Sequence, residues 1–161
     1  MKILVFSDSH GNPAFMQRVL KLYDVQTVIH LGDGAKDLLK LQSEYPAINM
    51  VAVAGNCDYY SDAPGEQVIT VGQGVTRRIL LLHGHNHSVK MGLNRLMYYA
   101  QEKEVDACLF GHTHIPLVDR HGAVFFMNPG SIAKPVPPKP PSYGILTISD
   151  DGGIAGEVLT L

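Results

Sequence analysis

The chain has 161 residues, of which 45% are hydrophobic and 17% are charged, and its formal net charge is −2. This composition is typical of a globular domain and excludes a disordered, collagen-like or coiled-coil chain. The near-neutral charge, without a long run of Lys or Arg, excludes an extended nucleic-acid surface as the main function, and the apolar runs are too short for a membrane span. We therefore expect a single cytoplasmic domain over residues 1–161 with no membrane partner, in which Cys57 and Cys108 are reduced thiols.

The first third of the chain alternates strand-like with helix-like segments. Apolar runs at residues 2–7, 27–31 and 48–54 predict strands, and helical spacing of apolar residues at 12–23 and 35–41 predicts the helices between them. Strands that alternate with helices are typical of an α/β fold with a largely parallel sheet.

From residue 61 onward, strands dominate. One long helix is predicted over residues 89–104, and the other apolar segments predict strands at 66–71, 77–82, 107–110, 116–119, 123–127, 143–149 and 154–159. We expect these strands to form a second sheet that is mixed or antiparallel. The proline-rich segment 135–141 is predicted as a stiff loop within the domain, because a strand follows it.

The loops after five of the predicted strands contain side chains that bind metals in proteins: Asp8, His10, Asp33, Asn56, His83, His85, His112 and His114. Because the carboxyl ends of parallel strands open into one crevice, we expect these side chains to meet there. Carboxylate, amide and imidazole ligands without thiolate suit Mn²⁺, Fe or Zn²⁺. Two divalent ions about 3.5–4 Å apart need a bridging carboxylate, and Asp33 is the candidate for it.

The order of these motifs along the chain resembles the calcineurin-like metallophosphoesterase superfamily. The motifs are Asp8-x-His10, Gly32-Asp33, Gly55-Asn56, His83-Gly-His85 and Gly111-His-x-His114. Together with the short chain and the segment Asn128-Pro-Gly-Ser131, they are most similar to the small bacterial and archaeal phosphodiesterase branch, to which the eukaryotic protein Vps29 is related. Each motif alone is weak, but the five in this order are specific.

The resemblance implies both a fold and a reaction. The fold is a four-layer α-β-β-α sandwich of two mixed β-sheets flanked by helices, and the reaction is hydrolysis of a small phosphodiester by a hydroxide that bridges two divalent metals. One metal would be held by Asp8, His10, Asp33 and His114, and the other by Asp33, Asn56, His83 and His112. Mn²⁺ is the expected ion, with Ni²⁺, Co²⁺, Fe²⁺ and Zn²⁺ as alternatives. We expect Asp33, Asn56 and His85 to act in the catalytic step, and the resemblance is compatible with a homodimer.

Two departures from the family pattern bear on the proton donor and on the substrate. Cys57 occupies the place of a His that protonates the leaving oxygen in many members, so the general acid is left open between Cys57, His85, His10 and a metal-bound water. The Arg that follows the second Asp in protein phosphatases of the family is also absent. Loss of that guanidinium favours a diester over a monoester dianion, unless Lys134 or the amides near residues 128–131 replace it.

Further polar residues are open to more than one interpretation. Asp37 is interpreted as a carboxylate at a helix N-terminus, and Asp58 as either a turn former or a support for the ligands. His85 lies two residues beyond His83, so an extended chain would place it over the substrate phosphate rather than in solvent. Three histidines are assigned no role: His30, His87 and His121.

Two other functions fit the same motifs. A Vps29-like protein-binding scaffold with little or no turnover is one alternative, and a metal-binding regulator is another. Retention of all seven expected ligands favours the enzyme, because scaffold members of the family tend to lose them.

Overall fold

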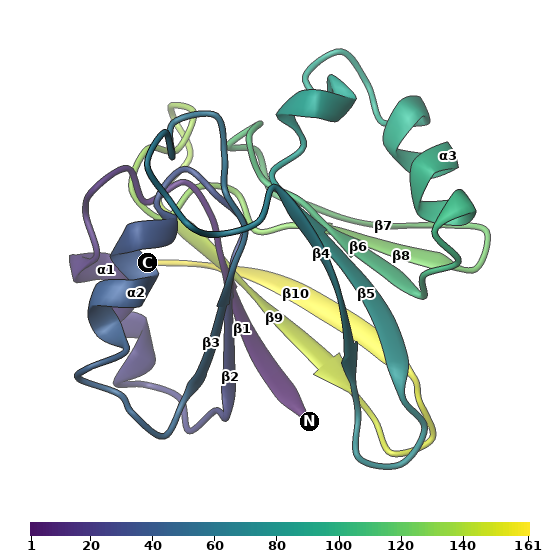
Figure 1. The fold of residues 1–161 in the computed structure, drawn as a ribbon, viewed down its shortest axis with the longest axis horizontal. Coiled ribbons are helices and arrows are strands. Elements are labelled where there is room, and N and C mark those ends of the chain that lie inside the picture. Colours follow the sequence, from purple (N-terminus) through teal and green to yellow (C-terminus); the bar gives the residue numbers. More distant parts are fainter.

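The computed structural model describes residues 1–161 and contains two five-stranded β-sheets that pack face to face (Figure 1). The first sheet, in the order β10-β9-β1-β2-β3, consists of β1 (Lys2–Phe6), β2 (Thr27–His30), β3 (Asn49–Ala52), β9 (Ser142–Ile148) and β10 (Ile154–Thr160). The second sheet, in the order β4-β5-β6-β8-β7, consists of β4 (Glu66–Val71), β5 (Arg77–Leu82), β6 (Ala107–Leu109), β7 (Leu117–His121) and β8 (Val124–Asn128). Both sheets are mixed, because β1, β2 and β3 run parallel, as do β5, β6 and β8, whereas the remaining strands pair antiparallel.

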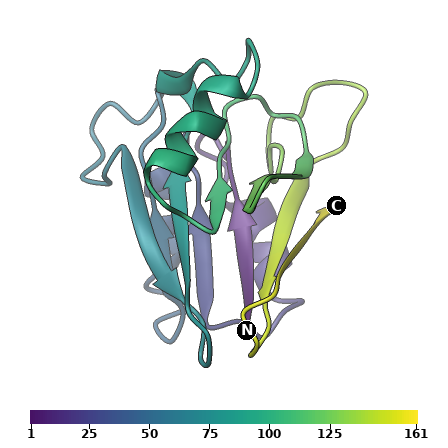
Figure 2. The same ribbon diagram turned by 90° about the vertical axis from the view of Figure 1, so that its right-hand side faces the viewer.

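The helices lie on the two outer faces of the paired sheets. α1 (Ala14–Leu20) and α2 (Ala35–Leu41) pack on the first sheet, and α3 (Asn94–Glu102) packs on the second. Figure 2 shows α3 lying across the second sheet, with the first sheet behind it. This arrangement confirms the predicted α-β-β-α sandwich. None of the helices has both the length and the apolar character that a membrane span requires.

Side-chain alternation explains how the first strand is buried on both faces. Ile3 and Val5 join the cluster between the two sheets, which includes Leu81 of the second sheet. Leu4 and Phe6 point the other way, into the cluster beneath α1 and α2. Because successive side chains of a strand point to opposite faces, a strand covered on both sides has a continuous apolar sequence.

The last two strands differ from the sequence prediction. We expected them in the second sheet, but β9 pairs antiparallel with β1, with Lys2 opposite Thr147, and β10 pairs with β9. An apolar pattern specifies that a segment is a strand, but its partner depends on contacts between residues far apart in the sequence.

The long helix is also shorter than the predicted range 89–104. The residues before it include Ser88 with φ +53° and Gly92 with φ +137°, and such values interrupt a right-handed helix. α3 therefore begins at Asn94, and a separate 3₁₀ helix, η1 (His85–His87), precedes it. The other predicted ranges differ from the observed ones by at most three residues at either end. The proline-rich segment 135–141 forms an irregular loop between β8 and β9, as predicted.

Candidate metal centre

Loops from both sheets converge where parallel strands end. The residues that follow these strands are Asp8 and His10 after β1, Asp33 after β2, His83 after β5, and His112 and His114 after β6. Backbone hydrogen bonds join the loops, because the N–H of Asp8 donates to the carbonyl of Gly32 at 3.0 Å and the N–H of Gly111 donates to that of His83 at 3.1 Å. The loops at the carboxyl ends of these strands therefore meet, as the sequence predicted.

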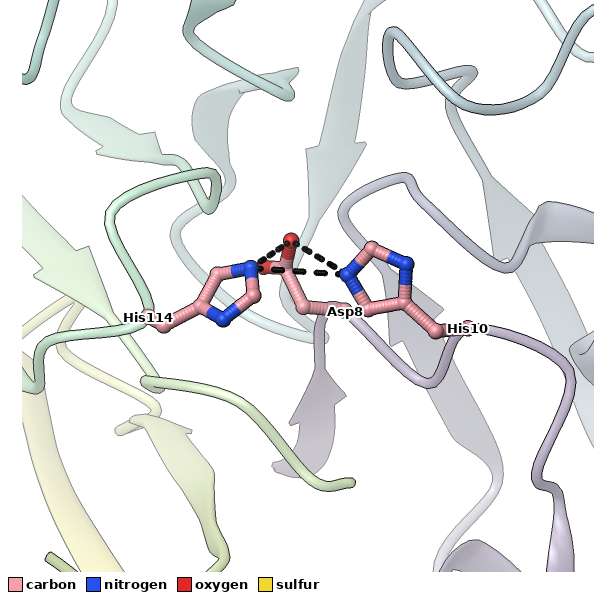
Figure 3. A group of neighbouring side chains, drawn as sticks. All are labelled: Asp8, His10 and His114. Atoms are coloured by element: carbon pink, nitrogen blue, oxygen red, sulfur yellow. Dashed lines mark hydrogen bonds and ion pairs between the residues drawn. The ribbon is translucent and has the colours of Figure 1, made fainter. Parts of the chain in front are cut away.

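Asp8, His10 and His114 form a first group of candidate ligands (Figure 3). Nε2 of His114 lies 3.0 Å and Nε2 of His10 lies 3.8 Å from Oδ1 of Asp8. The two imidazole nitrogens are 3.4 Å apart, and the two rings approach the carboxylate from opposite sides. Donor atoms this close together can bind one ion.

Asp8, Asp33 and His83 form a second group. Nε2 of His83 lies 3.4 Å from Oδ2 of Asp33 and 3.9 Å from Oδ1 of Asp8. Oδ2 of Asp33 is also 3.9 Å from Nε2 of His10, and Asp8 belongs to both groups, so the two groups are adjacent. The ring of His112 lies beside that of His83, with 5.0 Å between the ring centres.

Two buried atoms of the centre, Oδ1 of Asp8 and Nε2 of His83, have no hydrogen-bond partner. Nδ1–H of His83 donates to the carbonyl of Leu31 at 2.7 Å, and Nδ1–H of His114 donates to the carbonyl of Lys134 at 2.5 Å. Since a carbonyl only accepts, each neutral ring turns the lone pair of Nε2 toward the carboxylates. Burial of unpaired acceptors that face one another is unfavourable, and a cation between them removes this penalty. The residues therefore fit a divalent metal ion.

The charged groups of the centre shift one another's pKa values. Burial acts to raise the pKa of Asp33, but the facing His83 and the backbone N–H of Cys57, 2.7 Å from Oδ1, hold this pKa well below its usual range. Burial acts to lower the pKa of His83, but Asp33 and Asp8 outweigh it and raise this pKa. Burial and the charge of His83 lower the pKa of His112 to about 4. Ionised carboxylates beside imidazoles that can lose a proton are suited to exchange protons for a metal.

The candidate ligands have an unusual backbone conformation. Positive φ angles occur at Asp8 (+57°), His10 (+46°), Asp33 (+53°), His112 (+67°) and His114 (+58°). This left-handed conformation costs a non-glycine residue on the order of 1 kcal/mol or more. The strain is concentrated where the ligands leave their strands, as expected of a functional site.

A hydrogen-bonded chain that the sequence analysis missed supports the loop after β1. The N–H of Gly32 donates to Nδ1 of buried His30 at 3.2 Å, so Nε2 of His30 bears the proton and donates to Oγ of Ser9 at 3.0 Å. The Ser9 hydroxyl then donates to Oδ2 of Asp37 at 2.7 Å, and the N–H of Gly11 donates to the same oxygen at 2.7 Å. Burial lowers the pKa of His30 to about 4, which keeps its ring neutral. Asp37 does lie in the first turn of α2, but it also fixes this loop.

Asp58 joins the loops after β2 and β3. Its Oδ1 accepts hydrogen bonds from the N–H groups of Gly34 at 3.0 Å and Ala35 at 3.2 Å, and its Oδ2 accepts one from Gly55 at 2.8 Å. Of the two interpretations offered for Asp58, the structure supports that of a residue that holds the loop of Asp33 in place.

We expect Asp58→Ala to weaken Mn²⁺ binding by roughly 10–100-fold, because three backbone N–H groups lose their acceptor and the loop of Asp33 loosens. Isothermal titration of the chelator-treated protein measures this affinity. Asp62→Ala, at an exposed position of the same loop region, is the control and should bind Mn²⁺ as the unaltered protein does. Equal affinity in the Asp58 and Asp62 variants would contradict the assignment.

Asn56 and His85 lie at the edge of the centre. The side chain of exposed Asn56 donates to Sγ of Cys57 at 3.4 Å, and no hydrogen bond connects its amide to another candidate ligand. The expectation of an extended chain from His83 to His85 is wrong, because Gly84 has φ +103° and η1 begins after it. The ring of His85 is nevertheless 5.5 Å from that of His83, and its Nδ1 is buried without a hydrogen-bond partner.

Two of the histidines without an assigned role, His87 and His121, contact residues that are not candidate ligands. The ring of His87 packs 4.5 Å from that of Tyr99, and Nε2 of His121 lies 2.9 Å from Asp119. Cys57 is exposed, with its thiol close to donor atoms of His10 and Asp33.

The end of β8 and the residues that follow it support two of the loops of the centre. The Ser131 hydroxyl donates to the backbone carbonyl of Asp8 at 2.8 Å. The Asn128 amide donates to the carbonyl of Gly111 at 2.9 Å and to Oγ1 of Thr113 at 3.0 Å. This segment therefore holds the loops after β1 and β6 together rather than forming a plain turn.

Comparisons with known proteins agree with the motif order. The calcineurin-like phosphoesterase superfamily domain matches residues 1–151. The probable metallophosphoesterase YsnB of Bacillus subtilis is 37% identical over 154 residues, which are 94% of this chain and 86% of YsnB. The phosphodiesterase YfcE of Escherichia coli is 32% identical over 171 residues, with coverage of 91% and 87%. A solved structure of Vps29 with zinc from Entamoeba histolytica matches with a TM-score of 0.77 at 25% identity, with coverage of 99% and 98%. The chain therefore belongs to the calcineurin-like phosphoesterase superfamily, in the branch of these relatives, as its motifs predicted.

Proposed function

We propose that the protein is a phosphodiesterase that depends on two divalent metal ions. The pair of buried, unpartnered atoms in the centre, Oδ1 of Asp8 and Nε2 of His83, carries the proposal of a metal site. The relationship to YfcE, a phosphodiesterase, supports the reaction. When bound, the ions supply a hydroxide nucleophile and neutralise the phosphoryl oxygens.

The seven candidate ligands divide between the two ions. We assign Asp8, His10, Asp33 and His114 to one ion, and Asp33, Asn56, His83 and His112 to the other. Asp33 is the shared ligand in this assignment, which follows the family resemblance. Its Oδ2 lies near both His10 and His83, as does Oδ1 of Asp8. Carboxylate, amide and imidazole donors suit Mn²⁺, Fe or Zn²⁺, and of these we propose Mn²⁺.

His85 is the candidate for contact with the substrate phosphate. Its ring is partly exposed and lies 5.5 Å from that of His83 and 6.1 Å from that of His112, beside two candidate ligands. A neutral imidazole here can donate a hydrogen bond to a phosphoryl oxygen. No Arg follows Asp33 in the sequence, so no guanidinium there can bind two charged oxygens of a monoester dianion at once. A diester has only one such charge, and the absence of the Arg therefore favours a diester substrate.

A protein-binding scaffold is the second candidate function. It rests on the likeness to Vps29, which the resemblance identifies as a relative used for protein binding. Complete retention of the candidate ligands, with their strained backbone, supports the enzyme instead.

The test is hydrolysis of bis-p-nitrophenyl phosphate by protein that is stripped with a chelator and then reloaded with Mn²⁺, Ni²⁺, Co²⁺, Zn²⁺ or Mg²⁺. We expect no turnover in the stripped protein and the highest turnover with Mn²⁺. Stoichiometric metal binding without turnover for any ion would overturn the phosphodiesterase and favour the scaffold.

A further inference from the structure

A cavity of about 360 Å³ opens beside the candidate metal centre. His10 and Asp33 form part of its wall, so the cavity is continuous with the centre. Three lysines also line it: Lys36 and Lys40 from α2, and Lys134 from the loop after β8.

The acidic side chains in this wall are already engaged. Both oxygens of Asp58 accept backbone N–H groups, and Oδ2 of Asp37 accepts hydrogen bonds from Ser9 and Gly11. The other oxygen of Asp37 lies 3.5 Å from Nζ of Lys40. The oxygens of Asp37 and Asp58 therefore have partners within the wall, and together with Asp33 these carboxylates balance the formal charge of the three lysines.

Lys36 and Lys134 have no carboxylate partner. Lys40 is the one cavity lysine in an ion pair, and Nζ of Lys36 lies 5.9 Å from the ring centre of the exposed Tyr60. Two hydrogen bonds fix the backbone of Lys134. Its N–H donates to Oγ of Ser131 at 2.7 Å, and its carbonyl accepts a hydrogen bond from Nδ1–H of His114. Two unpaired ammonium groups therefore border the metal centre. One of them belongs to Lys134, whose backbone carbonyl holds the candidate ligand His114 in place.

A second cavity, of about 250 Å³, borders His85 and has the opposite character. Glu66, His85 and His87 line it, and no Lys or Arg does. Glu66 is paired with Nζ of Lys103 at 3.3 Å. Lysine side chains therefore border the crevice on the side of His10 and not on the side of His85, so a phosphate group finds ammonium donors on the first side.

We propose that the lysine-lined cavity binds a second phosphate group of the substrate, and that the natural substrate is a phosphodiester with a further terminal phosphate on one ester arm. The inference rests on the proposed phosphodiesterase function and narrows its substrate class. Lys36 and Lys134 bind the second phosphate, and Lys40 adds charge that its pairing with Asp37 reduces.

The test compares two substrates that differ by one phosphate: the p-nitrophenyl ester of thymidine 5′-phosphate, with and without a 3′-phosphate. We expect a KM roughly tenfold lower for the 3′-phosphorylated ester, and most of that difference should vanish in the double variant Lys36→Gln/Lys134→Gln. The double variant Lys21→Gln/Lys139→Gln removes the same charge at exposed positions outside the cavity and should keep the difference. A matched pair of glycerol esters shows whether the nucleoside contributes.

A second readout does not require turnover. Acetic anhydride acetylates exposed lysines, and thymidine 3′,5′-bisphosphate should slow acetylation of Lys36 and Lys134 several-fold while leaving Lys21 and Lys139 unchanged, as measured by mass spectrometry. Equal KM values for the two esters, or a difference that survives in the Lys36/Lys134 variant, would overturn the inference. If bis-p-nitrophenyl phosphate is not hydrolysed, the proposed phosphodiesterase function fails. The acetylation experiment then shows by itself whether Lys36 and Lys134 bind a phosphate group.

Discussion

Asp33→Ala should lower metal-dependent kcat/KM on bis-p-nitrophenyl phosphate by at least about 1000-fold, which corresponds to about 4 kcal/mol of lost transition-state stabilisation. Asp33 faces both groups of candidate ligands, with Oδ2 3.9 Å from Nε2 of His10 and 3.4 Å from Nε2 of His83. Its removal takes away the one carboxylate assigned to both ions. The number of Mn²⁺ ions bound per chain should therefore fall together with the rate.

Two controls separate loss of the centre from loss of the fold. Asp24→Ala removes a carboxylate at an exposed position and should retain full activity. Circular dichroism should show the same secondary structure for the Asp33 and Asp24 variants. If Asp33→Ala kept more than a tenth of the activity with two ions bound, Asp33 would not be the shared ligand.

Gly55→Ala should destabilise the protein by about 1–3 kcal/mol and also weaken metal binding, because a methyl group at this position has no space. A Cβ on Gly55 would lie 2.5 Å from the backbone nitrogen of Asp33. Backbone cannot move aside as the end of a flexible side chain can, so the loop of Asp33 must shift. Urea unfolding in the presence of chelator gives the free energy of unfolding without a contribution from bound metal.

Gly65→Ala is the matched control for this substitution. A Cβ on Gly65 meets no atom within 4 Å, so its free energy of unfolding should be unchanged or slightly higher. Equal stability and equal Mn²⁺ affinity in the two variants would show that the loops of Asp33 and Gly55 do not depend on their close approach.

Local sequence patterns predicted most of the elements and the position of the candidate centre. The run Lys2–Phe6 is a strand buried on both faces, and its apolar sequence shows this directly. Asp8, Asp33, His83 and His112 follow strands whose carboxyl ends meet, so their convergence follows from a parallel arrangement.

Features that depend on contacts between distant segments were not predicted. The role of His30 requires Ser9, which lies 21 residues before His30. It also requires Asp37, which binds Ser9 from 28 residues further along the chain. The turn at Gly84 that ends the extended chain before His85 depends on a positive φ, which glycine permits but does not require. The residues next to a single His or Gly in the sequence do not reveal whether the His supports a loop or whether the Gly forms a turn.

The pairing of β9 with β1 has a consequence for how the protein forms during synthesis. During translation, residues 1–114 contain every candidate ligand before β9, at 142–148, has been made. Until β9 pairs with β1, one edge of β1 lacks its partner. Ser131, whose hydroxyl donates to the carbonyl of Asp8, is likewise made after all of the candidate ligands. Such long-range pairing slows folding and leaves an unpaired strand edge exposed on the nascent chain. The candidate ligands are therefore synthesised before the segments that hold them in place, and we expect the centre to form only after β9 and β10 have paired with the first sheet.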